Sequence, residues 1–134
     1  MTNFRFLKSE RLKGQKIIER LFQTGESIYK YPVRAVYNFT TIELNDPRDS
    51  FIKVGFSVPK RKLKSAVKRN LIRRRLREAY RLKRTHIINE VGFDPTDRQL
   101  HLILIYQHDQ ILEYKVIEKS VEKLLKAVLS DVSS

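Results

Sequence analysis

The sequence contains no cysteine among its 134 residues, so disulfide bonds and thiolate metal sites are excluded. No run of apolar residues approaches the ~20 that are needed to span a bilayer. Residues 1–8 also lack the apolar region of a secretory signal peptide. These absences are compatible with a reducing compartment, and we expect a cytoplasmic protein that has no membrane partner.

The sequence also offers little for catalysis by its own side chains. His86, His101 and His108 are scattered, and no two of them have the spacing of metal ligands within a helix. Ser57 has no obvious histidine partner, and no glycine-rich phosphate-binding loop is present. A metal-dependent nuclease needs clustered carboxylates or histidines to hold ions and activate water. We therefore expect no catalytic residue and no metal site in the protein.

Positive charge is concentrated in one segment. The formal net charge is +13, and residues 59–84 hold 13 Lys or Arg residues but a single acid, Glu78. The rest of the chain is nearly neutral, with 15 Lys or Arg residues and 14 acids. Like charges packed this closely repel one another, and a polyanionic partner offsets that repulsion. Nucleic acid is the partner that we expect first, and an acidic membrane surface is the second.

The hydrophobic pattern predicts a single domain over residues 1–134, with residues 1–10 as a loose arm. Helices are predicted at 17–22 (before the stop residue Gly25), 66–84 (after the N-cap residue Ser65) and 117–128, and strands at 33–44, 51–58 and 101–106. Turn residues 45–47 separate the first two strands, which we expect to pair as an antiparallel hairpin with a long connection. The order α-β-β-α-β-α predicts an α+β (α/β) two-layer sandwich with helices packed on a sheet.

The predicted basic helix has two distinct faces when its residues are placed at ~100° per position. One face is apolar and spaced for a core: Ile72, Leu76, Ala79 and Tyr80. The other face is polar and cationic: Asn70, Arg73, Arg74, Arg77 and Arg81, with Arg69 at its border. Lys68 and Arg69 lie in the first turn, where the helix dipole disfavours cations, and this costly placement indicates a binding surface. Arginine suits phosphate because its planar group bridges two oxygens. A solvated charged face is the alternative, with Glu78 in an ion pair with Arg74 or Arg81.

The residues from Phe56 to Tyr80 resemble the signature of the protein component of bacterial ribonuclease P. In that family a strand ending in Ser-Val-x-Lys leads into Ala-Val-x-Arg-Asn-Arg and then into Lys/Arg-Arg-x-x-Arg-Glu. The matching residues are Ser57, Val58, Lys60, Ala66, Val67, Arg69, Asn70, Arg73, Arg74, Arg77 and Glu78. A weaker similarity extends to Arg11, Leu12, Phe22 and Gly25. Leu71 departs from the pattern, which has arginine there, so this one RNA contact is not carried over.

The resemblance implies an RNA-binding subunit that assists a catalytic RNA and Mg²⁺ in removing the 5′ leader from precursor tRNA. The Mg²⁺ would serve the RNA, while the protein alone would bind no cofactor and be monomeric. The implied RNA-binding residues are Lys60, Arg61, Lys62, Lys64, Lys68, Arg69, Asn70, Arg73, Arg74, Arg77 and Arg81. The leader would lie in a cleft between the first helix and the sheet, lined by Ile18, Phe22 and Tyr37, with core packing as the alternative for each.

The resemblance also implies a left-handed βαβ crossover, similar to that of the second domain of ribosomal protein S5, although such connections are usually right-handed. Three other functional classes stay open on the sequence alone. A ribosomal or RNA-chaperone protein would use the same basic helix without affecting tRNA processing. An autonomous metal nuclease is disfavoured by the missing carboxylate cluster. A DNA-binding architectural protein is disfavoured because no recognition-helix pattern is present.

Overall fold

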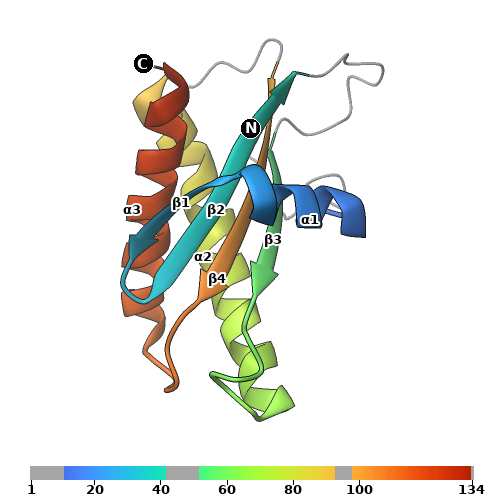
Figure 1. The fold of residues 1–134 in the computed structure, drawn as a ribbon. Helices are drawn as coiled ribbons and strands as arrows, with labels where there is room; N and C mark the ends of the chain where they lie inside the picture. Colours follow the sequence, from blue (N-terminus) through green and yellow to red (C-terminus); the bar gives the residue numbers. More distant parts are fainter. Residues whose placement is uncertain (1–10, 42–51, 93–97, 134) are drawn as a thin grey trace.

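The computed structural model describes residues 11–41, 52–92 and 98–133, which form three helices and four strands. In chain order these are α1 (Gln15–Thr24), β1 (Glu26–Lys30), β2 (Val33–Thr41), β3 (Ile52–Ser57), α2 (Ala66–Val91), β4 (Arg98–Tyr106) and α3 (Tyr114–Ser133). Figure 1 shows the strands in one sheet, with α1 in front of it and α2 and α3 behind. The predicted two layers are therefore the sheet and the α2/α3 pair, and α1 covers part of the opposite face.

The strand order is β1-β2-β4-β3, with β4 antiparallel to β2 and parallel to β3. The prediction that β2 and β3 form a hairpin is therefore wrong, because β4 lies between them. The continuous apolar sequence of β4 is covered on both faces and belongs at the centre of the sheet. The hairpin partner of β2 is β1, which the sequence did not reveal because its residues are mostly polar. The turn predicted at 45–47 lies outside the described residues.

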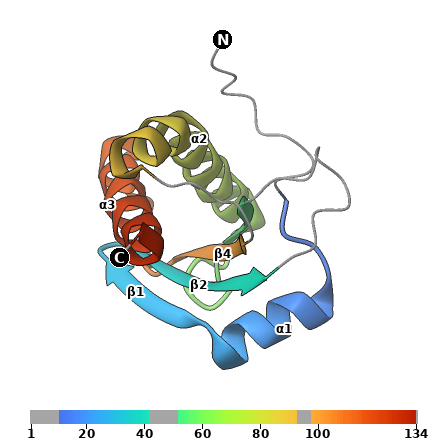
Figure 2. The same cartoon turned by 90° about the horizontal axis from the view of Figure 1, so that it is seen from above.

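The connection from β3 through α2 to β4 is a left-handed crossover. In Figure 1 both strands run downward, β4 lies to the left of β3, and α2 passes behind the sheet, which Figure 2 shows from above. This hand is the one that the resemblance implied and the opposite of the usual one. The crossover places the N-terminal end of α2 beside the C-terminal end of β3, at the lower end of the sheet in Figure 1.

Helix ends follow local chemistry. Ser65 caps α2 as predicted, since its Oγ accepts the backbone N–H of Lys68 at 3.3 Å. Helix α2 runs past the predicted end to Val91, because Ile87 continues its buried stripe and Gly92 ends it with a φ of 70°. Gly25 follows α1 with an extended backbone, and glycine is required there because a Cβ would lie 2.4 Å from the carbonyl oxygen of Leu21.

The sheet has a large core on one face and a small one on the other. Alternate strand residues pack against α2 and α3 in the large core, which contains Val33, Ala35, Ile52, Val54, Leu102, Leu104, Ile72, Leu76, Leu124 and Leu125 among others. The small core joins Leu21 of α1 to Val36, Ile103 and Ile105. Leu21 is the only buried residue of α1, and its burial contributes about 1.5–3 kcal/mol to the docking of that helix. Ile18 packs partly against this core, and the other α1 side chains are exposed.

Candidate nucleic-acid interface

The loop between β3 and α2 presents a cluster of cations. It is anchored by Val58 and Leu63, which are buried, while the backbone N–H of Leu63 donates to the carbonyl oxygen of Pro59 at 3.2 Å. The side chains between and beside these anchors are exposed: Lys60, Arg61, Lys62 and Lys64. The loop is thus held by its apolar residues, and its charges face solvent.

Arg69 has a structural task that sequence reasoning missed. Its Nη1 donates to the carbonyl oxygens of Leu63 and Lys64, each at 2.8 Å. The side chain is half-buried and ties the cationic loop to the first turn of α2. The predicted role in RNA contact stays a prediction, and the geometry adds that Arg69 positions the lysines and arginine of the loop.

The central residues of the predicted stripe line a groove of about 430 Å³ on α2, which we call the arginine groove: Asn70, Arg73, Arg74 and Arg77. Arg73 donates to Oδ1 of Asn70 at 2.9 Å, which orients both side chains along the helix. Arg74 and Arg77 are exposed and form no ion pair with any other described residue. The groove therefore holds uncompensated positive charge.

Arg81, at the end of the same stripe, is already paired. Its Nη2 lies 2.5 Å and its Nε 3.2 Å from the two carboxylate oxygens of Glu78. This pairing confirms one of the two partners expected for Glu78. The hydrogen bond from Arg81 holds the pKa of the Glu78 carboxyl below its usual value, so the pair stays charged at neutral pH. Arg81 has less free charge to offer a phosphate than Arg74 or Arg77.

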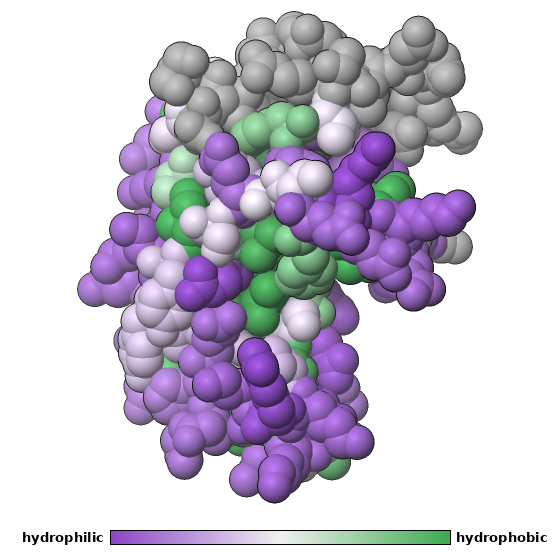
Figure 3. All heavy atoms as spheres, viewed as in Figure 1, coloured by the Kyte–Doolittle hydropathy of each residue, from purple (hydrophilic) through white to green (hydrophobic). Residues whose placement is uncertain are grey.

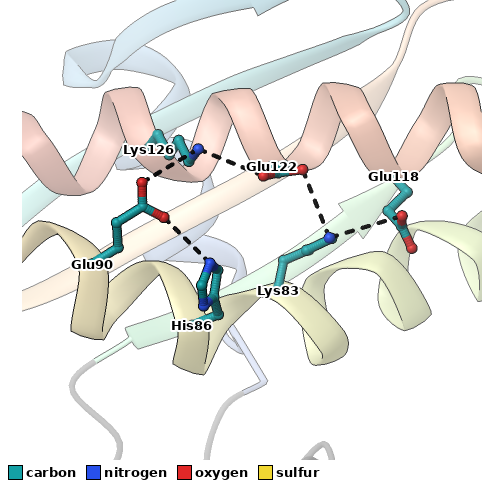
Figure 4. A network of polar contacts seen from close by, with 6 residues as sticks. All are labelled: Lys83, His86, Glu90, Glu118, Glu122 and Lys126. Carbon is teal, nitrogen blue, oxygen red and sulfur yellow. Dashed lines mark ion pairs between the residues drawn. The ribbon is translucent and has the colours of Figure 1, made fainter.

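Beyond Arg81, Lys83 and Glu90 of α2 form ion pairs with α3. Lys83 lies 3.9 Å from Glu118 and 3.7 Å from Glu122, and Lys126 on α3 bridges Glu122 to Glu90 on α2. Figure 4 shows this network running between the two helices, with His86 beside Glu90. Lys83 and Glu90, in the C-terminal half of α2, thus have ion-pair partners on α3, whereas Arg74 and Arg77 in the N-terminal half have none among the described residues.

A cleft of about 480 Å³ lies between α1 and the β3 side of the sheet, and we call it the α1 cleft. Its lining residues are Arg11, Leu12, Ile18, Phe22, Val54, Gly55, Phe56, Ser57, Arg77 and Ile103. Phe22 is 53% exposed, while Ile18 is half-buried against the small core. Figure 3 shows apolar side chains in the middle of this face, beside the hydrophilic side chains of α1.

Two of the three predicted cleft residues lie in the cleft, and the third does not. Ile18 and Phe22 line it, but Tyr37 is 3% exposed and lies on the opposite face of the sheet, in the large core. Its hydroxyl donates to Glu26 at 3.0 Å. The prediction for Tyr37 is therefore wrong. Strand alternation places Tyr37 on the same face as the core residue Ala35.

Arg77 joins the two surfaces, because it lines both the arginine groove and the α1 cleft. Its position follows from the crossover, which sets α2 next to the end of β3. The arginine groove and the α1 cleft therefore meet at this side chain.

The histidines have ordinary partners. Nε2 of His101 lies 2.9 Å from Gln99, and burial followed by the charge of Lys53 lowers the His101 pKa. Nδ1 of His108 accepts the backbone N–H of Gln110 at 3.0 Å. Over residues 11–41, 52–92 and 98–133, no three acidic or histidine side chains converge as metal ligands. No helix in that part of the chain is long and apolar enough to span a membrane.

Comparison with known proteins identifies relatives along nearly the whole chain. The family model described as Ribonuclease P matches residues 6–129. The ribonuclease P protein component of Porphyromonas gingivalis is 31% identical over 133 residues, covering 98% of this chain and 91% of that protein. The corresponding protein of Chlorobaculum tepidum is 29% identical over 128 residues, covering 92% and 82%.

Solved structures agree in fold. The RNase P protein of Staphylococcus aureus aligns with a TM-score of 0.65 at 24% identity, covering 90% of this chain and 96% of that one. The RNase P protein of Thermotoga maritima aligns with a TM-score of 0.64 at 17% identity, covering 88% and 96%. The mixed sheet and its three helices are thus an arrangement that these proteins share.

Proposed function

This chain belongs to the ribonuclease P protein family, and on that premise we propose that it binds a catalytic RNA and assists it in removing the 5′ leader of precursor tRNA. It would do so in the cytoplasm as a protein subunit that joins the RNA as a monomer. The observation that carries this proposal is the position of Arg77, at the junction of a cationic groove and a partly apolar cleft.

The arginine groove and the cationic loop would bind the phosphates of the catalytic RNA. Arg74 and Arg77 are available because no described carboxylate neutralises them. Each cation that meets a phosphate releases condensed counterions, so affinity depends steeply on salt. A protein that neutralises about 6–10 phosphates loses roughly 10³–10⁵ in affinity between 50 and 200 mM salt.

The α1 cleft would hold the unpaired leader. Phe22 offers an exposed aromatic face, and stacking of a base on such a ring contributes roughly 1–3 kcal/mol for any base. Ile18 adds apolar contact, and Arg77 supplies a cation for the leader backbone at the cleft wall. Binding of this kind does not depend on the identity of the bases.

Bond cleavage would be the work of the RNA and of Mg²⁺ held by the RNA. The protein would act on this step indirectly: its cations would offset phosphate repulsion around the folded RNA and so lower the Mg²⁺ concentration needed for cleavage. The leader contacts would favour precursor over product, because the product lacks the leader.

Reconstitution tests the proposal directly. The protein is mixed with bacterial ribonuclease P RNA at low Mg²⁺, and leader removal from precursor tRNA is measured, with protein alone and RNA alone as controls. We expect cleavage to require the RNA and to be strongly stimulated by the protein. Cleavage by the protein alone would identify an autonomous nuclease. RNA binding without any stimulation would identify a ribosomal or chaperone type of protein.

A further inference from the structure

We propose that the single-stranded path does not end at the α1 cleft but continues along the face of the sheet that carries α1 to a second nucleotide-binding subsite formed by Tyr29 and Arg34. This inference rests on the proposed function, since it concerns the same leader. The occupant would be an unpaired segment of the leader beyond the part that lies in the cleft.

A continuous row of side chains links the cleft to this subsite. Ser57, which lines the cleft, is the register partner of Ile105 on β4, and Ile105 is the partner of Arg34 on β2. Arg34 is in turn the partner of Tyr29 on β1. Ile105 belongs to the small core, so the row lies on the same face as α1. Three steps of about 4.8 Å between strands give a row about 14 Å long.

The far end of this row is arranged as a stacking platform. The guanidinium carbon of Arg34 lies 5.2 Å from the ring centroid of Tyr29, within the range of a cation–π contact. Nη1 of Arg34 also donates to the Ser27 hydroxyl at 2.8 Å, which fixes the orientation of the guanidinium. Tyr29 is 43% exposed, so a base can reach its side chain from solvent.

Charge favours a polyanion at this end of the sheet. Arg34 forms no ion pair with any other described residue. Glu26, an acid on β1, hydrogen-bonds the Tyr37 hydroxyl on the opposite face of the sheet. A cation held over an aromatic ring can contact a phosphate while the ring stacks on the adjoining base. The phosphates of a nucleic-acid strand are ionised, so they form stronger, charge-assisted hydrogen bonds with this unpaired guanidinium than the neutral carbonyls of a peptide strand would.

The test uses the reconstituted ribonucleoprotein and a series of precursor tRNAs whose leaders increase in length. Tyr29→Leu removes the aromatic face but keeps an apolar side chain, and Tyr29→Phe keeps the face as the matched control. We expect the leucine variant to bind long-leader precursors about fivefold or more weakly and short-leader precursors normally. The phenylalanine variant should match the wild type at every length, and Arg34→Ala should share the length-dependent loss.

Other outcomes overturn the inference. If Tyr29→Leu keeps the wild-type affinity for precursors of every leader length, Tyr29 does not form a stacking subsite. A loss that is equal for all lengths, or that appears in the affinity for the catalytic RNA, assigns the residue to folding or assembly. Phe22→Ala keeps the two proposals distinct. If that variant weakens leader binding and Tyr29→Leu does not, the proposed function stands and this inference fails. If the wild-type protein gives no stimulation, the proposed function itself fails.

Discussion

Replacing Arg77 with alanine tests the interface at the point where its two parts meet. The side chain is exposed and has no ion-pair partner among the described residues, so its removal uncovers no core. We expect the free energy of unfolding to change by no more than about 0.5 kcal/mol. A change in the free energy of RNA binding that exceeds this value then reflects a lost contact with RNA, not a loss of folded protein.

The size of that effect follows from counterion release. The slope of log affinity against log salt concentration is negative. Loss of one phosphate contact reduces its magnitude by about 0.7 for a single strand and about 0.9 for a duplex. Relative to a 1 M reference, these slopes correspond to about a fourfold to sixfold loss of affinity at ~0.15 M salt. The loss should shrink as salt is raised and nearly vanish at the reference concentration.

Arg75→Ala is the matched control. It removes the same charge from the same helix, but Nη1 of Arg75 donates to the carbonyl oxygen of Leu112 at 2.7 Å, in the segment before α3. We expect Arg75→Ala to lower the free energy of unfolding by about 1 kcal/mol and to leave the salt slope almost unchanged. Titrations of labelled catalytic RNA at several salt concentrations measure both slopes. An unchanged slope for Arg77→Ala, or an equal decrease in both variants, would refute the reasoning.

Three further variants extend the test. Phe22→Ala should weaken leader affinity about fivefold or more while the domain stays folded by circular dichroism, because the ring is 53% exposed; unfolding would instead assign Phe22 to the core. Glu78→Gln should raise RNA affinity and steepen its salt slope, since it frees Arg81 from a carboxylate; a weaker affinity would count against the stripe. Arg69→Ala should lower the free energy of unfolding by about 1–3 kcal/mol in denaturant titrations, because two loop carbonyls lose a charged donor; unchanged stability would contradict its positioning role.

Sequence reasoning worked best where a local rule decides the outcome. The period of the basic segment correctly placed Ile72 and Leu76 in the core and gathered Asn70, Arg73 and Arg77 on the outer face. The N-cap and the partner of Glu78 also depend on residues within one helical turn. Such features are determined by spacing alone, so no knowledge of the rest of the fold was needed.

The errors arose where distant segments decide the outcome. Strand alternation showed that Tyr37 and Ala35 share a face, but it does not reveal which helix covers that face. Pairing of β2 with β4 brings together residues 57 to 73 positions apart, and nothing local to β2 encodes it. The side chains of Arg69 and Arg75 likewise donate to carbonyl oxygens outside their own helix. From the sequence alone, arginines that hold loops in place cannot be distinguished from arginines that are available for binding.

The network between α2 and α3 has a consequence for how the molecule meets its partner. Residues 59–84 hold most of the excess positive charge, and Lys83 near the end of that segment is paired with α3. Positive charge is therefore concentrated at the end of the molecule where α2 begins, and the electrostatic field is asymmetric. At long range such a field orients the protein, so that its cationic end faces a polyanion before the two molecules make contact. At low ionic strength a larger share of encounters is then correctly oriented. This raises the association rate constant more than it lengthens the lifetime of the complex.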